Sequence, residues 1–144
     1  MPISLQWLDQ PSDQDKIDLE KLYNDAPKDW LSESSDKSAQ WAQTQVNKGH
    51  KVALGRFNDR ILCGAVLMAQ SESGAHAYQF QVDKLCVRKI TRQRGVAKQL
   101  LVRLCQWAND CAAALYIEDV DGGLAGLYEL GFVQYQQGWR YLPH

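Results

Sequence analysis

A strand-like run that leads through a basic, glycine-containing turn into a long helical pattern is the strongest constraint on the fold of this chain. The run is Leu85-Cys86-Val87, the turn spans residues 92–95, and the helical pattern begins at Val96. The first backbone N–H groups of a helix have no intrahelical partner and carry about half a positive charge, so they stabilise an anion. We therefore expect a strand, turn and helix unit that binds a phosphate group.

The residues of this turn favour the same interpretation. Gly95 has no Cβ, so it can adopt positive φ and lie directly under an anionic oxygen, and Ala97 keeps the next approach open. Seven basic residues and no acidic one lie from position 84 to 109: Lys84, Arg88, Lys89, Arg92, Arg94, Lys98 and Arg103. The alternative is an ordinary helix start with a solvated basic first turn. Cations are unfavourable at the positive end of a helix, so the cluster indicates a compensating anion.

Length and composition indicate a globular protein. A chain of 144 residues suits one domain, 1–144, and its 45% hydrophobic and 23% charged residues are ordinary for that class. No apolar stretch approaches the roughly twenty residues that a membrane span needs. Residues 1–8 lack the basic start and apolar core of a signal peptide, so we expect a cytoplasmic protein.

The cysteines and histidines give no sign of a metal or redox site. Cys63, Cys86, Cys105 and Cys111 show no Cys-x-x-Cys spacing, and we expect buried free thiols. The three histidines are scattered, and none has a potential ligand partner at helical spacing. We therefore expect no metal.

The N-terminal third of the chain predicts one strand and two helices. Residues 3–8 alternate as a strand does, and Ser12 can cap a helix by accepting from the amide of Asp15. That helix runs to about Tyr23 with four apolar residues: Ile17, Leu19, Leu22 and Tyr23. A second helix spans residues 35–48 and stops at Gly49.

The rest of the chain predicts mostly strands. Runs at 51–57, 61–70 and 77–87 are separated by short loops, so neighbouring strands should be antiparallel. After the basic turn, one helix face is apolar: Val96, Leu100, Leu101, Leu104, Cys105, Trp107 and Ala108. Further patterns indicate a strand at 113–117, a short helix at 124–130 and a hairpin of 132–135 with 139–142. The fold class is therefore α/β (α+β).

The motif Arg92-Gln93-Arg94-Gly95-Val96-Ala97 and its placement resemble the coenzyme A pyrophosphate loop of the GNAT acetyltransferase superfamily. This resemblance implies a mixed, mostly antiparallel sheet flanked by helices. A bulge would splay the strand at 80–87 from the strand at 113–118. The pantetheine arm would then add to the exposed edge through the backbone of Leu85 and Val87. The implied ligand contacts are Leu85, Cys86, Val87, Thr91, Arg92, Gln93, Arg94, Gly95, Val96, Ala97 and Lys98.

The catalytic groups expected of an acetyltransferase are incomplete. The amide of Val87 could donate to the thioester oxygen. Catalytic relatives commonly place a tyrosine acid four residues before the last Gly-Phe; here that position is Leu127, and Tyr128 is one residue away. One helical residue is about a hundred degrees of rotation, so Tyr128 would point elsewhere. The candidate bases are strand-end carboxylates that could equally be solvated: Asp83, Glu118 and Asp119. The sequence therefore favours a protein that is not an enzyme.

Four blocks, one of which contains this motif, resemble the PanZ/PanM family of GNAT proteins in the same order along the chain. They are Ser12-Asp13-Gln14-Asp15-Lys16-Ile17-Asp18-Leu19, Arg56-Phe57-Asn58-Asp59-Arg60, the segment 85–96, and Gln136-Gln137-Gly138-Trp139.

Membership of this family would imply that acetyl-CoA or CoA is sensed rather than consumed. The loaded protein would bind the precursor of aspartate 1-decarboxylase and promote its self-cleavage to the pyruvoyl form. It would also restrain the mature enzyme, giving feedback on coenzyme A synthesis. Arg56 and Asn58 match polar hairpin positions expected to touch the partner, although a simple turn explains Asn-Asp equally well.

Two other functions remain open from the sequence. The first is a true N-acetyltransferase for an amine. The second is a nucleic-acid-binding protein that uses residues 91–109 as a recognition helix. A net charge of −1 and acidic residues clustered at 110–129 disfavour the second.

Overall fold

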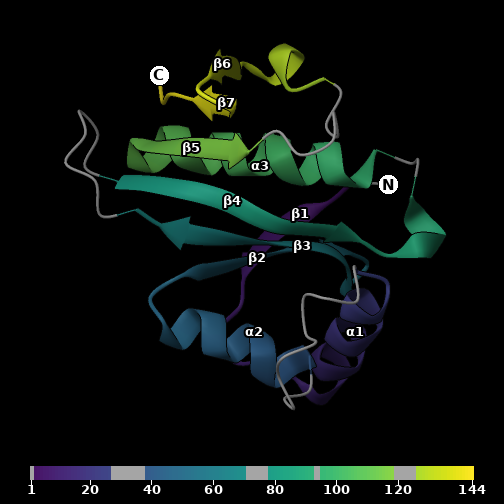
Figure 1. Ribbon diagram of the computed structural model, residues 1–144. Coiled ribbons are helices and arrows are strands. Elements are labelled where there is room, and N and C mark those ends of the chain that lie inside the picture. The colour runs from purple at the N-terminus through teal and green to yellow at the C-terminus, as the bar shows by residue number, and fades with distance from the viewer. Residues whose placement is uncertain (1, 27–37, 71–77, 93–94, 119–125) are drawn as a thin grey trace.

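One seven-stranded mixed sheet, in the order β1-β2-β3-β4-β5-β7-β6, forms the centre of the molecule (Figure 1). The computed structural model describes residues 2–26, 38–70, 78–92, 95–118 and 126–144. The strands are β1 Ser4–Trp7, β2 Lys51–Phe57, β3 Arg60–Ala69, β4 Tyr78–Val87, β5 Ala113–Glu118, β6 Val133–Tyr135 and β7 Gly138–Tyr141. All neighbours are antiparallel except β4 and β5. The predicted fold class and the antiparallel order of β2, β3 and β4 are confirmed.

Helices cover both faces of this sheet. They are α1 Asp13–Asn24, α2 Ser38–Asn47 and α3 Val96–Cys111, with single 3-10 turns η2 Lys89–Thr91 and η3 Tyr128–Leu130. In Figure 1, α1 and α2 lie on one side of the sheet and α3 on the other. Two hydrophobic clusters correspond to these layers, one around α3 and one around α1 and α2. Among the described residues, none of the helices combines the length and apolar character that crossing a bilayer requires.

The start of α1 follows the prediction. The Asp15 amide donates to Ser12 Oγ, and the Ser12 amide donates back to the Asp15 carboxylate, both at 3.1 Å. This reciprocal pair satisfies two donors that a helix start leaves free. The prediction for Ile17 was wrong, because its side chain is 48% exposed. The carboxylate of Asp18 faces the sheet instead.

Asp18 connects α1 to β3 through a buried carboxylate that is only 1% exposed. It accepts two hydrogen bonds from Arg60 Nε and one from Arg60 Nη2 at 2.7–3.1 Å, one from the Ile61 amide at 3.1 Å and one from Gln14 at 3.0 Å. Burial raises the pKa of Asp18, but these donors outweigh it and lower that pKa to about 2. α1 is therefore fixed to the β2–β3 hairpin by a charge that stays ionised.

The apolar face of α3 is confirmed. Its buried residues are Val96, Leu100, Leu101, Leu104, Cys105 and Ala108. Trp107 is half-buried and packs edge-on against Trp7, with ring centroids 4.9 Å apart, and against Phe80 at 5.5 Å. Burial raises the pKa of Cys63, Cys86 and Cys105 to about 12. The prediction of buried free thiols is confirmed at these three positions, whereas Cys111 is a free thiol that is only half-buried.

The C-terminal region differs from its prediction in detail. The expected helix at 124–130 is a single 3-10 turn at 128–130, and residues 119–125 lie outside the described residues. The final hairpin forms as predicted, but β7 rather than β6 pairs with β5, so the second strand of the hairpin is internal. The predicted start of the second helix, residues 35–37, also lies outside the described residues.

Candidate functional site

β4 and β5 separate halfway along their length. Their parallel pairing runs from Tyr78↔Ala113 to Gln81↔Tyr116 and ends there, although both strands continue. A register shift between Gly64 and Val66 places two residues of β4 opposite one residue of β3, which is a β-bulge. The splayed strand pair and its bulge, which the superfamily resemblance implied, are therefore present.

The bulge is centred on Lys84. Its φ is +53°, in the left-handed region that side chains seldom adopt. The Lys84 amide donates a hydrogen bond to the Asp83 carboxylate at 2.8 Å, so Asp83 stabilises this bend. A kink of this kind increases local twist and bends the strand. The second half of β4 is thereby directed away from β5.

The backbone of Val87 faces the opening between the two strands. The Arg88 amide donates to the Leu62 carbonyl of β3 at 2.9 Å, and Val87 is paired with Cys63 one step earlier. Bonded and non-bonded pairs alternate along an antiparallel ladder. The N–H and C=O of Val87 therefore point away from β3, where an amide-bearing ligand could bond to them.

The helix start that follows is suited to an anion. Gly95 is the N-cap of α3 with φ +72°, as predicted, and a Cβ there would meet nothing within 4 Å. The Gln99 amide donates to the Gly95 carbonyl at 3.0 Å and is the first bond of the helix. The amides of Val96, Ala97 and Lys98 precede that bond and have no acceptor within α3 itself, so helix geometry directs them outward as donors. Gln93 and Arg94 lie outside the described residues.

Two backbone amides that precede the start of α3 already have partners within the chain. This reduces the number of predicted ligand contacts whose amides are available to an anion. Within η2 the Thr91 amide donates to Arg88 at 2.9 Å, and the Arg92 amide donates to Lys89 at 3.3 Å. Thr91 Oγ1 also donates to the Arg88 carbonyl at 2.9 Å, and the residue is buried. The amides of Thr91 and Arg92 are therefore not available to an anion, whereas those at the start of α3 are suited to one.

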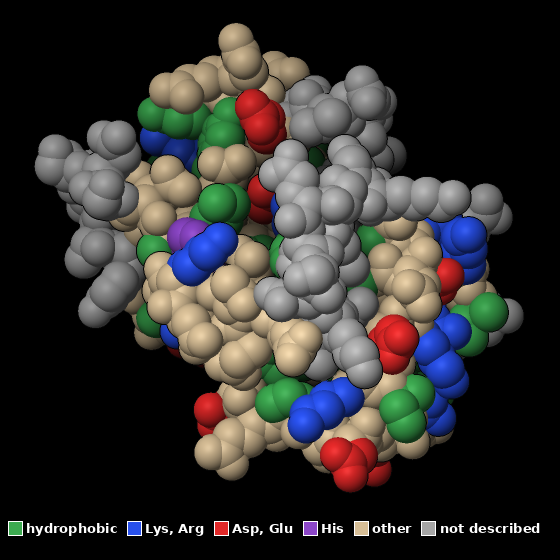
Figure 2. Space-filling model, turned by 60° about the horizontal axis from the view of Figure 1, so that its bottom comes forward, with side chains coloured by type: hydrophobic (Ala, Val, Ile, Leu, Met, Phe, Trp, Pro, Cys, Tyr) green, Lys and Arg blue, Asp and Glu red, His purple; other side chains and the backbone are tan. Residues whose placement is uncertain are grey.

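Basic side chains surround this helix start, but several have partners within the chain. Figure 2 shows Lys and Arg side chains gathered along the edge where η2 and the start of α3 lie in Figure 1. Arg88 Nε donates to the Asp25 carboxylate at 3.1 Å, and Arg92 Nη2 donates to the Asp25 carbonyl at 2.7 Å. Lys98 pairs with Glu129 at 3.2 Å, and both side chains are largely exposed. Such an exposed pair is weak, so Lys98 can turn to a ligand.

Asp25 is a residue of this region that the sequence analysis did not single out. Its carboxylate also accepts from the Lys89 amide at 3.0 Å, and this bond, followed by those from Arg88, holds the pKa of Asp25 below its usual range. Asp25 is the C-cap of α1, 63 residues before Arg88. No local pattern could have connected them, because the contact exists only once the sheet has brought α1 beside η2.

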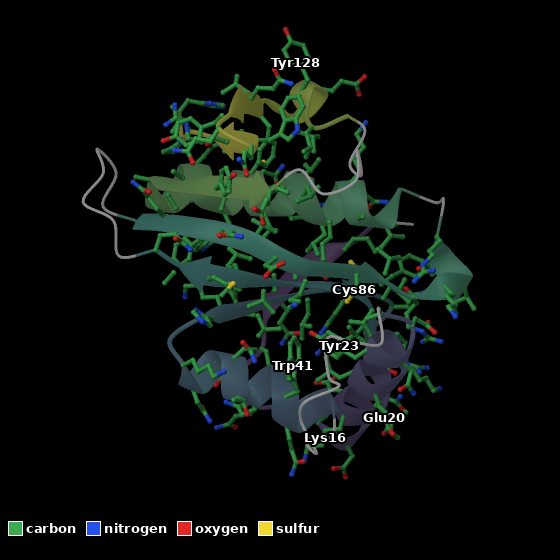
Figure 3. All side chains as sticks on the ribbon, viewed as in Figure 1. Lys16, Glu20, Tyr23, Trp41, Cys86 and Tyr128 are labelled. Atoms are coloured by element: carbon green, nitrogen blue, oxygen red, sulfur yellow. The ribbon has the colours of Figure 1, made fainter. Side chains whose placement is uncertain are left out.

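The candidate catalytic side chains do not gather at the opening. Tyr128 is 76% exposed and points away from the sheet in Figure 3, while Leu127 is buried. Glu118 is exposed at the end of β5, opposite Gly138. Asp83 is occupied at the bulge, and Asp119 lies outside the described residues. The described part of the chain brings no acid and base together beside Val87.

A buried phenol lies on the opposite side of β4 from α3. Tyr23 and Trp41 pack edge-on with centroids 5.0 Å apart, and Figure 3 shows them beneath Cys86. Among the described residues the Tyr23 hydroxyl has no hydrogen-bond partner, and burial raises its pKa. Tyr23 was predicted as one of the apolar residues of the first helix, but no local pattern indicated that its hydroxyl would be buried.

The β2–β3 hairpin carries the two predicted partner residues. Asn58 and Asp59 have φ of +50° and +64°, which is a two-residue type I′ turn, and Asn58 is exposed. Arg56 is 15% exposed and engaged: it donates to Asp15 through both terminal nitrogens at 3.0 Å, to the Asp59 carbonyl at 3.0 Å and to Gln6. The structure thus places Asn58 at the surface and uses Arg56 to hold the hairpin against α1.

Comparison with known proteins places these features in context. A family model described as "Acetyltransferase (GNAT) domain, PanZ" matches residues 2–119. The chain is 31% identical to the PanD regulatory factor of Escherichia coli K12 over 148 aligned residues, covering 97% of this chain and 98% of that protein. It is 30% identical to the PanD regulatory factor of Salmonella typhimurium with the same coverage.

A solved structure adds a ligand-bound neighbour. The solution structure of the putative N-acetyl transferase YhhK from E. coli bound to coenzyme A matches with a TM-score of 0.57 and 26% identity, covering 99% of each chain. The GNAT-type sheet described above is therefore shared with a protein that binds coenzyme A.

Proposed function

This chain belongs to the PanZ family of GNAT domains, and we propose that it is a coenzyme A-responsive regulator of aspartate 1-decarboxylase (PanD). In this proposal it binds acetyl-CoA or CoA, and the loaded form binds the decarboxylase precursor and promotes its self-cleavage. It also restrains the mature enzyme. The chain acts by binding, in a cytoplasmic setting, as a single domain over residues 1–144.

The observation that carries the ligand part is the direct continuity of an open strand edge and an anion-binding helix start. β4 ends with Val87 facing the gap left by β5, and the chain reaches the Gly95 cap only eight residues later. The pantetheine arm of coenzyme A consists of amides, which can bond to a strand edge. Its diphosphate requires donors and positive charge, which a helix start supplies.

The contacts divide between backbone and side chain. Leu85 and Val87 bind the pantetheine arm through the backbone of β4, and Cys86, which lies between them, pairs with Gly64 of β3. The amides of Gly95, Val96, Ala97 and Lys98 bind the diphosphate, while Thr91 supports the turn. Gln93, Arg94 and the cations of Arg92 and Lys98 complete the anion site with charge-assisted contacts.

The partner part rests on the family and on the hairpin. Both full-length relatives are named PanD regulatory factors. Asn58 is exposed at the tip of the β2–β3 turn, so we assign it a direct contact. Arg56 acts on the same surface by fixing the turn through its bonds to Asp15 and Asp59.

A cleavage assay tests the whole proposal. The purified chain is mixed with the decarboxylase precursor, with and without acetyl-CoA, and cleavage is followed by gel electrophoresis. We expect acceleration that depends on acetyl-CoA. Precursor cleavage at the same rate with and without the chain, at any acetyl-CoA concentration, would refute the regulator assignment. Thiol release from acetyl-CoA across a panel of amines would instead indicate an acetyltransferase.

A variant pair tests the hairpin. Asn58→Ala should raise the concentration of the chain needed for half-maximal cleavage by about fivefold or more, as expected for a central interface residue. Gln136→Ala is the matched control, because Gln136 is also an exposed turn residue with positive φ, +53°, in the other hairpin. Equal effects of the two substitutions would contradict a partner contact at Asn58.

A further inference from the structure

Asp25 joins the end of α1 to the segment that leads into the anion site. Its Oδ2 accepts from Arg88 Nε at 3.1 Å and from the Lys89 amide at 3.0 Å, and its carbonyl oxygen accepts from Arg92 Nη2 at 2.7 Å. One residue therefore bonds to three of the five residues from position 88 to 92. All three bonds are tertiary, since α1 and η2 are distant in sequence.

The other two acidic anchors of α1 serve a different part of the molecule. Asp15 binds Arg56, and Asp18 binds Arg60 and the Ile61 amide, so both fix the β2–β3 hairpin. Of these three carboxylates, Asp25 alone contacts η2. The helix thus carries one anchor at its C-terminal end whose target is the approach to Gly95.

We propose that Asp25 is a positioning residue for the anion site, which fixes residues 88–92 so that the free amides at the start of α3 are held ready for a diphosphate. The inference rests on the proposed coenzyme A binding. It assigns to Asp25 a role through its neighbours rather than through the ligand.

Removing the Asp25 carboxylate makes two opposed contributions to the affinity of the site for an anion. Removing the carboxylate frees the charge of Arg88, which alone would strengthen anion binding. The Arg88 side chain is only 17% exposed, however, so losing Asp25 would also leave a partly buried charge without this partner. Removal also breaks two of the three bonds, those from Arg88 and from the Lys89 amide, and leaves the bond from Arg92 to the Asp25 carbonyl. Residues 88–92 are then less ordered, and completing their order when the ligand binds weakens affinity. We expect the second contribution to dominate.

Arg92 retains donors for a ligand while it is held. A guanidinium has five N–H groups in a fixed fork, and the bond to the Asp25 carbonyl uses one of them. Holding Arg92 by the backbone of Asp25 limits the rotamers of a long, exposed side chain. The fork is then presented near the helix start without losing its capacity to bind phosphate.

Calorimetric titration of the full chain with two probes tests this inference. The probes are CoA and ADP, which carries a diphosphate but no pantetheine arm. We expect Asp25→Ala to weaken both by about tenfold and by similar factors, because the loop is common to both. Asp25→Asn should lie between wild type and Asp25→Ala, since its carboxamide oxygen can still accept from the Lys89 amide. A loss for CoA alone would place the defect at the β4 edge and overturn the inference.

The control is Asp18→Asn, which removes a buried charge from the same helix and should destabilise the fold while leaving both affinities unchanged. Equal weakening by Asp18→Asn and Asp25→Asn would show a general effect of α1 and would overturn the positioning role. Wild-type affinity, or tighter binding, in both Asp25 variants would overturn it as well. If the wild-type chain binds neither probe, the proposed function itself fails, and that result is distinct from unchanged affinity in the variants. Asp25→Asn keeps the test decisive if Asp25→Ala does not fold.

Discussion

Replacing Gly95 with alanine separates the role of backbone conformation from the role of the anion site. Gly95 has φ +72°, and a Cβ at this position would meet nothing within 4 Å of the protein. A steric clash with the described residues is therefore not expected. The added methyl group would instead occupy the space in front of the free amides of α3, where we place the diphosphate.

The magnitude of each effect can be worked out. A non-glycine residue in the left-handed region costs about 1–2 kcal/mol. Part of this is offset because alanine loses about 0.4–1 kcal/mol less chain entropy on folding than glycine. The free energy of unfolding should fall by about 1 kcal/mol, which lowers the Tm by about 4 °C for a chain of this size. Losing one charge-assisted bond to phosphate costs about 1.5–3 kcal/mol. CoA affinity should therefore fall about 10- to 150-fold.

The assay combines thermal unfolding of the free chain with calorimetric titration of CoA. Gly49→Ala is the matched control, because Gly49 also has positive φ, +91°, and a Cβ there meets nothing within 4 Å. Gly49 follows α2, away from the proposed site. The two variants should lose similar stability, and only Gly95→Ala should lose CoA affinity. Unchanged CoA binding in Gly95→Ala, or equal losses in both variants, would refute the placement of the diphosphate.

Three further predictions concern stability and side-chain roles. The pKa of Asp18 is lowered to about 2, so its ionised form contributes about 2 kcal/mol to the free energy of unfolding. This contribution is fully present above pH 4 and is lost as the pH falls from 4 toward 2. Urea unfolding at pH 5 and pH 3 should therefore show a larger loss of stability in wild type than in Asp18→Asn. Arg56→Ala should lower the free energy of unfolding by about 1–2 kcal/mol. It should also raise the pKa of Asp15, which the Arg56 hydrogen bond now lowers, as NMR titration of that carboxyl would show. Tyr128→Phe should leave CoA affinity and Tm unchanged, because its exposed ring contacts solvent; a tenfold loss of affinity in calorimetry would contradict this placement.

The parts of this fold that sequence could predict are those determined by neighbouring residues. Ser12 and Asp15 lie three positions apart, so their capping pair is visible in the chain, and the positive φ of Gly95 follows from its place between a basic turn and an apolar helix. The three central strands and the face of α3 followed from periodicity. The bulge at Lys84 was implied only by the family, because nothing about a lysine indicates positive φ.

The parts that escaped prediction depend on contacts between distant segments. Ile17 fitted an apolar stripe, but the bonds of Asp18 to Arg60 and the Ile61 amide turn that carboxylate toward the sheet and leave Ile17 outside. In the sequence, Asp25 is one acidic residue in a polar loop. Its bonds with Arg88 and the Lys89 amide form only because α1 packs beside η2. In both cases an ion pair across more than 40 residues decides the outcome, and such a pair has no local signature.

The early end of the β4–β5 ladder has a mechanical consequence. Four residue pairs between β4 and β5 join strands β1–β4 to strands β5, β7 and β6. Beyond these pairs, β4 and β5 are no longer hydrogen-bonded to each other. An extended amide chain bound in that gap would act as a substitute strand. It would join two parts of the sheet that, in the described portion of the chain, are connected by this short ladder and by their packing against α3. Ligand binding in this gap should then make the whole sheet more rigid. Amide hydrogen exchange should slow in both parts of the sheet, at the ends far from the four-pair ladder.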